Sequence, residues 1–116
     1  MSTMAAGKSR GASRPVYVLA QISIHDRERY DRYAARFLDV LEAHQGMLLA
    51  ADEKPTVIEG RWPRDKVVLV SFPNREQFDS WVSSPDYEQI STDRAASTEG
   101  TVLLVRGLAG GVLGRK

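Results

Sequence analysis

Glu59 and Trp62 are the residues whose types and spacing most directly suggest chemistry. Glu59 ends a mostly apolar segment and precedes Gly60, and Trp62 follows within three residues. A carboxylate beside an indole at a strand end can have a raised pKa and act as a general acid or base, or it can bind a cationic ligand. The alternative is structural: Glu59 pairs with an arginine or accepts hydrogen bonds from turn amides, while Trp62 seals the contact between helix and sheet.

Four other residues are candidates for ligand binding: Tyr17, Tyr33, Trp81 and Arg94. The two tyrosines can donate phenolic hydrogen bonds into a cleft, Trp81 can form an apolar wall, and Arg94 can neutralise an anionic ligand. Tyr33 lies on the apolar stripe of a predicted helix, where core packing with a satisfied hydroxyl is the alternative. Arg94 can instead be solvated or pair with Glu59.

Metal and cofactor chemistry find little support in the sequence. His25 and His44 lie at opposite ends of one predicted helix, about 28 Å apart, so they cannot share a metal ion within one chain. The absence of cysteine excludes thiolate metal sites and thiol catalysis. The serines lack the Gly-x-Ser-x-Gly pattern, and no glycine-rich loop joins a strand to a helix. We therefore expect no metal and no cofactor.

Hydrophobic periodicity predicts strands and helices in the order β-α-β-β-α-β. The expected strands are 16–24, 47–51, 66–72 and 101–106, and the expected helices are 27–44, a short one after residue 74, and 85–96. Residues 56–59 either extend the second strand or start another. This order is that of a ferredoxin-like α+β sandwich, with helices on one face of a four-stranded antiparallel sheet.

The ends of the predicted helices carry recognisable signals. Asp26, Asn74 and Ser84 each precede a helical segment and can act as N-caps. Proline follows Ser84 at the first helical position, and Gly46 is expected to end the first helix. The helices should therefore begin where these caps lie.

Both faces of the predicted strands are apolar. In strand 66–72, Val68 and Val70 lie on one face, and Val67 and Leu69 lie on the other. Helices on one side cover only one face, and the second would leave a larger apolar patch than monomers usually expose. We therefore predict a homodimer whose sheets pack face to face as an α+β barrel.

Charge and length exclude other classes of protein. The 116 residues suit one domain, and no apolar run is long enough to cross a membrane. Without the five basic residues near the two ends, the chain has 11 basic and 15 acidic residues, which makes nucleic acid a poor partner. We expect a cytoplasmic protein with a disordered leader (1–14, or else a transit peptide), one domain (15–107) and a flexible tail (108–116).

Residues 15–107 closely resemble the DUF1330 domain family, small bacterial proteins of uncharacterised function. The motifs that carry the resemblance are the pair Tyr30/Tyr33, Glu59-Gly60 followed by Trp62-Pro63, Phe72-Pro73, Trp81, and Ser84-Pro85-Asp86-Tyr87. The resemblance implies a ferredoxin-like fold and assembly as a dimeric α+β barrel. Family members usually place an arginine followed by glycines after the second strand. This chain has Ala51-Asp52-Glu53-Lys54-Pro55 there, which argues against an anion-binding role for that segment.

Two hypotheses for function follow. In the first, the dimer binds a small apolar or aromatic molecule, without turnover, in the cleft between the sheet and the first helix. In the second, it resembles cofactor-independent monooxygenases or isomerases of this fold, with Glu59 as the acid or base, Tyr33 and Arg94 as polar anchors, and Trp62 and Trp81 as walls. A cavity that both Glu59 and Tyr33 face would favour the enzyme. Glu59 paired to an arginine, with no cavity, would favour a binding or structural role.

Overall fold

Strand β2 (Val16–Ile24) defines the two faces of the sheet in the computed structural model, which describes residues 14–108. The even-numbered residues Val16 and Val18 are buried, whereas the odd-numbered Tyr17 on the opposite face is half-buried. This alternation is the period-two pattern that the sequence predicts for a strand.

The sheet has four antiparallel strands in the order β3-β4-β2-β5. Strand β3 comprises Met47–Asp52, β4 comprises Lys66–Phe72, and β5 comprises Thr98–Arg106. The order along the chain is βαββααβ, so the expected α+β ferredoxin-like fold is confirmed.

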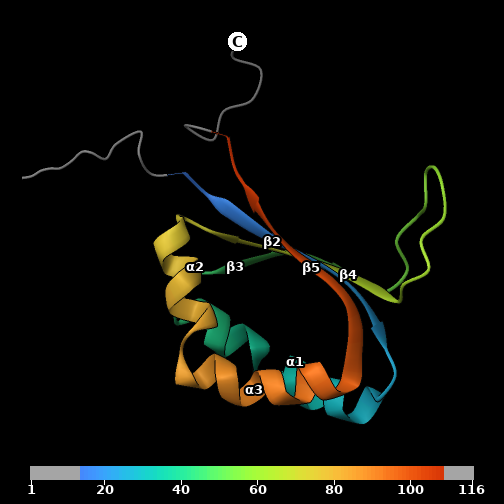
Figure 1. Cartoon of the computed structure of the whole chain (residues 1–116), viewed down its shortest axis with the longest axis horizontal. Helices are drawn as coiled ribbons and strands as arrows, with labels where there is room; N and C mark the ends of the chain where they lie inside the picture. The colour runs from blue at the N-terminus through green and yellow to red at the C-terminus, as the bar shows by residue number, and fades with distance from the viewer. Residues whose placement is uncertain (1–13, 109–116) are drawn as a thin grey trace, which may run out of the picture.

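Three helices lie on the same side of the sheet: α1 (Arg27–Glu42), α2 (Arg75–Val82) and α3 (Pro85–Ser97) (Figure 1). Buried side chains of these helices meet the even-numbered side chains of β2 and β4 to form the core. The apolar faces of β2 and α1 thus pack against each other, as the apolar stripe of the first helix predicts.

The three predicted N-caps are formed. The side chains of Asp26, Asn74 and Ser84 each accept a hydrogen bond from the backbone N–H three residues later, at 3.2, 2.9 and 3.1 Å. These bonds satisfy N–H groups that have no partner within the helix, and they fix where each helix begins.

Helix α1 ends at Glu42, two residues before the predicted end at residue 44. Gln45, not Gly46, adopts the left-handed backbone, with φ 68°. The N–H of Gly46 donates to the carbonyl of Leu41 at 3.0 Å, and a Cβ at Gly46 would overlap the Leu41 side chain and lie 2.9 Å from Phe72 Cε1. Glycine is therefore required here for close packing rather than for its backbone angle.

Two other boundaries are corrected. Residues 56–59 form no strand; they belong to the loop 53–65, which projects beyond the sheet (Figure 1). Strand β5 begins at Thr98, three residues earlier than predicted. Within this added part of the strand Gly100 pairs with Ile22, and its φ of 149° and close approach to the carbonyl of Gln21 suit a residue without a Cβ.

The sheet face opposite the helices, here called the open face, carries an apolar row across all four strands. Leu19 of β2 pairs with Leu69 of β4 and Leu103 of β5, and Leu69 pairs with Ala50 of β3. A neighbouring row contains Met47, Ser71, Tyr17 and Val105. The side chain of Leu103 is 45% exposed. No helix of the described chain covers this face.

The structure bears on the expected domain but not on most of the expected leader and tail. Residues 1–13 and 109–116, which hold nearly all of the expected leader and tail, lie outside the described residues. Within residues 14–108, no helix combines the length and the hydropathy that a membrane span requires.

Candidate functional site

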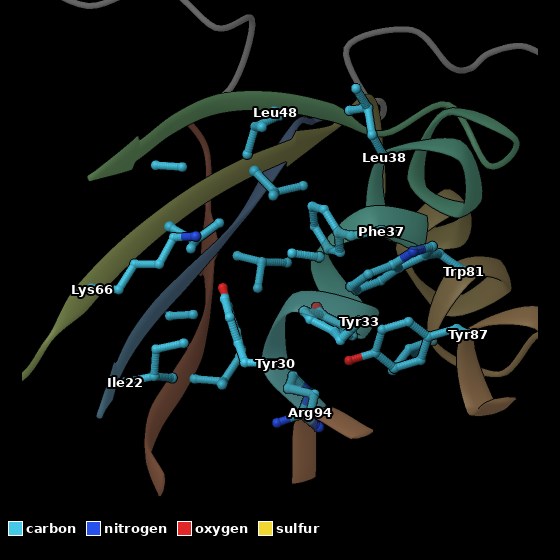
Figure 2. A pocket seen from close by; sticks show the side chains of 18 of the residues that line it. Ile22, Tyr30, Tyr33, Phe37, Leu38, Leu48, Lys66, Trp81, Tyr87 and Arg94 are labelled. Atoms are coloured by element: carbon cyan, nitrogen blue, oxygen red, sulfur yellow. The ribbon is translucent and has the colours of Figure 1, made fainter. Parts of the chain in front are cut away.

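A cavity of about 460 Å³ lies between the inner face of the sheet and the helices (Figure 2). The strands contribute small apolar side chains to its lining, among them Val18, Ala20, Val68 and Val70. Helices α1, α2 and α3 contribute mainly large aromatic ones. A volume in this range is typical of sites for small organic molecules.

Aromatic side chains form a continuous wall along the helical side of the cavity. Neighbouring ring centroids are 5.7 Å apart for Tyr30 and Tyr33, 5.5 Å for Tyr33 and Phe37, 6.2 Å for Phe37 and Trp81, and 4.2 Å for Trp81 and Tyr87. The first three residues recur on α1 at intervals of three and four, which places them on one side of the helix. The wall therefore follows directly from helical spacing.

Three tyrosine hydroxyls belong to this cavity, from Tyr30, Tyr33 and Tyr87. None of them has a hydrogen-bond partner among residues 14–108. Burial is the main cause that raises the pKa of Tyr33 well above its ordinary value; the nearby Tyr87 adds to the rise and Arg94 opposes it. The Tyr33 hydroxyl is thus a neutral donor at any physiological pH.

Two cations line the cavity, and Lys66 is the one with a nearby carboxylate. Its Nζ lies 4.9 Å from the Tyr30 ring centroid and 3.9 Å from Glu53 Oε2. Glu53 is held in turn by Arg27 at 2.9 Å, and this hydrogen bond is the main cause that lowers the pKa of Glu53. These contacts join the end of β3 to the start of α1 beside the cavity.

Arg94 is the second cation, and within the described chain it forms no ion pair. Its Nε is buried without a hydrogen-bond partner, as is Nε1 of Trp81. The neighbouring carboxylate, Asp93, is bound by Arg29 at 3.0 Å and by Arg32 at 3.5 Å. The hydrogen bond from Arg29 is the main cause that lowers the pKa of Asp93. Asp93 therefore does not neutralise Arg94.

Three of the predicted site residues, Tyr33, Trp81 and Arg94, come together in this cavity. Tyr17 lies on the open face, because the alternation along β2 turns it away from the helices. Trp62 does not line the cavity either: its Nε1 donates to Gln21 Oε1 at 2.9 Å, and Gln21 shares the face of Tyr17.

Glu59 lies apart from the cavity of its own chain. It is exposed, belongs to the loop 53–65, and forms no ion pair with another described residue. The arrangement in which Glu59 and Tyr33 face one cavity, which would favour an enzyme, is therefore not what this chain forms by itself.

Sequence reasoning missed three of the polar lining residues as members of the site: Tyr30, Lys66 and Tyr87. The signals were present, because Lys66 precedes Val68 and Val70 at the strand period of two, which directs it to the inner face. Tyr87 and Arg94 are seven residues apart on α3, close to two helical turns. Periodicity thus identifies the face of each residue, but not the presence of a cavity beside it.

No group of three His, Cys, Asp or Glu side chains within residues 14–108 could hold a metal ion. His44 Nδ1 lies 3.0 Å from Ser80 Oγ, a contact that links α1 to α2. The groups of the cavity that can contact a ligand are thus its aromatic rings, its tyrosine hydroxyls and its two cations.

Solved structures share this fold at low sequence identity. A protein of unknown function from Rhodopseudomonas palustris, RPA0582, is 19% identical, with a TM-score of 0.68 over 83% of this chain and 82% of that one. A dimeric ferredoxin-like protein of unknown function from Thermobifida fusca is 11% identical, with a TM-score of 0.59 over 88% and 97%. SnoaB, a cofactor-independent oxygenase from Streptomyces nogalater, is 14% identical, with a TM-score of 0.55 over 78% and 90%.

At the level of sequence, no significant match is found among curated proteins. The model of the domain of unknown function DUF1330 matches residues 15–108, which is nearly the whole described chain. This range agrees with the extent of the resemblance seen in the sequence. The chain therefore belongs to the DUF1330 family.

Proposed function

We propose that this protein binds a small apolar or aromatic molecule in the cavity between the sheet and α1. The observation that carries the proposal is a space of about 460 Å³ that the chain leaves unfilled beside five neighbouring aromatic rings. Protein cores normally pack without voids of this size, because empty apolar volume costs stability. A cavity retained at that cost, with a few polar groups around it, is the usual form of a binding site.

The rim of the cavity supports access from solvent. Leu38 of α1, Leu48 of β3 and Val82 of α2 line the cavity and are each about two-fifths exposed, at 43%, 38% and 39%. Figure 2 shows Leu38 and Leu48 at the same end of the cavity. A small molecule can therefore enter between the edge strand and the helices without unfolding of the core.

N-phenyl-1-naphthylamine, an uncharged dye whose fluorescence rises in apolar surroundings, tests this proposal. Ala34 and its neighbour Ala35 are both exposed on α1, but only Ala34 lines the cavity. We expect one dye per chain, an affinity lowered at least about tenfold by A34W because the indole occupies the site, and no change with A35W. Equal affinities for wild type and A34W would refute the cavity as the binding site.

The enzyme hypothesis, with Glu59 as acid or base, has less support. SnoaB shows that a cofactor-independent oxygenase shares this fold, but at 14% identity the likeness concerns the fold alone. Glu59 is not among the residues that line the cavity. We therefore expect Glu59→Gln to leave dye binding unchanged, and a loss of binding in this variant would revive the hypothesis.

We also propose that the protein is a homodimer whose open faces pack together. The supporting observation is the row Ala50-Leu69-Leu19-Leu103, which no described part of the chain covers. The Thermobifida fusca protein of similar fold is dimeric. Light scattering at micromolar concentration should give twice the 12.9 kDa mass of the chain, and a monomer peak would contradict the proposal.

A further inference from the structure

We propose that the ligand of this cavity is a hydrophobic organic acid, whose negatively charged oxygen binds Arg94 with the hydroxyls of Tyr33 and Tyr87 as additional donors. This inference rests on the proposed binding function and adds the charge and the orientation of the ligand. It is drawn from the one cation of the cavity that lacks a counter-ion, and from the groups around that cation.

The charge of Arg94 is uncompensated within the described chain. The cavity lining contains no aspartate or glutamate, and the adjacent Asp93 is already bound by Arg29 and Arg32. The Nε of Arg94 is buried and donates to no residue among 14–108. A buried donor on a charged group is costly to leave unpaired, and a carboxylate, which matches the guanidinium fork, would remove that cost.

Lys66, the other cation of the cavity, has less need of an anionic ligand group than Arg94, because it already has a carboxylate nearby. Glu53 lies 3.9 Å from its Nζ, and the Tyr30 ring lies beneath it. Its charge is therefore partly balanced by the protein. Lys66 has a carboxylate nearby and Arg94 has none within the described chain. We therefore place the anionic group of the ligand at Arg94.

Neutral donors lie near Arg94, because Arg94 and Tyr87 both act on the pKa of Tyr33. In Figure 2, Arg94 lies below Tyr30 and Tyr33, and the Tyr87 hydroxyl points toward the same space. Burial keeps the Tyr33 hydroxyl protonated, so it can donate to an anion but does not compete with one as a phenolate. The surroundings thus favour a negatively charged oxygen over a positively charged group.

The remainder of the cavity specifies an apolar body. Arg29 of α1 lies beside α3 at Asp93, and Leu38 is nine residues further along α1, which is about 13 Å. Figure 2 likewise places Leu38 and Leu48 at the end away from Arg94. Phe37 lies between these two ends in Figure 2, and Phe78 also lines the cavity. A molecule with an acid at one end and an aromatic or aliphatic body at the other matches this polarity.

Calorimetric titration with 2-naphthoate and its uncharged analogue 2-naphthalenemethanol tests the inference on the full chain. We expect wild type to bind naphthoate more tightly than the alcohol. Arg94→Met should weaken naphthoate about 10- to 100-fold, the range for a hydrogen bond to a charged group, and change the alcohol less than about threefold. R36M makes the same substitution at an exposed residue that does not line the cavity, and it should alter neither affinity.

The outcomes separate this inference from the binding function. Equal affinity of wild type for both probes, or an equal loss of both in R94M, would overturn the anion while leaving the cavity as a binding site. Failure of the uncharged dye to distinguish A34W from A35W would instead overturn the binding function. If circular dichroism shows that R94M is unfolded, Arg94→Gln, which keeps a polar side chain without the charge, decides in its place by the same criteria.

Discussion

At the scale of the residue, the Tyr33 hydroxyl illustrates how the cavity changes ordinary chemistry. A tyrosine in water ionises near pH 10, whereas burial raises the pKa of Tyr33 in the folded protein. The folded state therefore holds this proton at pH values where the unfolded state has lost it. The same burial that makes Tyr33 a permanent donor also makes it a source of alkaline instability.

The raised pKa of Tyr33 predicts how the stability of the protein changes with pH. Above about pH 10 only the unfolded state loses the Tyr33 proton, so the free energy of unfolding should fall with pH, by up to about 1.4 kcal/mol per unit from this residue. Tyr33→Phe should remove this contribution and flatten the profile. Urea unfolding between pH 9.5 and 11.5 measures the slope. Identical slopes for wild type and Y33F would mean that Tyr33 titrates alike in both states.

At the scale of the element, two adjacent residues at the end of α1 share what one glycine often does alone: one adopts the left-handed backbone, and the other allows close packing. Gln45 takes the left-handed backbone, which disfavours a side chain, and Gly46 accepts close contact with Leu41 and Phe72. A glycine that follows a helix commonly holds the left-handed position. Tertiary packing against the sheet moves that role to the preceding residue.

Gln45→Gly should consequently stabilise the protein by about 0.5–1 kcal/mol, because glycine adopts the left-handed conformation without strain. The same substitution at Gln89, an exposed residue inside α3, should destabilise by about 1 kcal/mol, as expected for glycine within a helix. Urea unfolding of both variants measures the two values. A loss of stability in Q45G would contradict the account of this helix end.

At the scale of the whole molecule, the two faces of one sheet differ in what they contact. The even-numbered side chains of β2 face the helices and the cavity, and the odd-numbered ones form the open face. The loop 53–65 binds two side chains of this face, Gln21 through Trp62 and Ser23 through Arg64, and the apolar rows beside them stay uncovered by the described chain. Ligand binding and dimer formation would therefore use opposite sides of the same strands.

Leu103→Glu tests the dimer without altering the cavity. Leu103 is exposed on the open face, and a charge there would be buried between the two sheets at a cost of several kcal/mol. The variant should sediment as a monomer at concentrations where wild type is dimeric. Ala35→Glu, which adds the same charge on the outer side of α1, should stay dimeric. A dimeric L103E would place the interface elsewhere.

The sequence predicts the fold well because period-two and helical patterns are strong here, and because the caps at Asp26, Asn74 and Ser84 mark the helix starts. It predicts the site only in part. Tyr33, Trp81 and Arg94 follow from their positions on helices that face the sheet. Glu59 and Trp62 suggest an acid–base or binding site because they are close along the chain. The loop that holds them lies away from the inner face of the sheet, so they do not line the cavity.

The central claim, that the cavity holds the apolar body of an acid with its charge at Arg94, is tested most directly by a crystal structure of the protein with 2-naphthoate. The account predicts the naphthalene ring beside Phe37 and Tyr33, with a carboxylate oxygen within hydrogen-bonding distance of Arg94. Naphthoate bound on the open face, or in the cavity with its carboxylate turned toward Leu38 and Leu48, would contradict it.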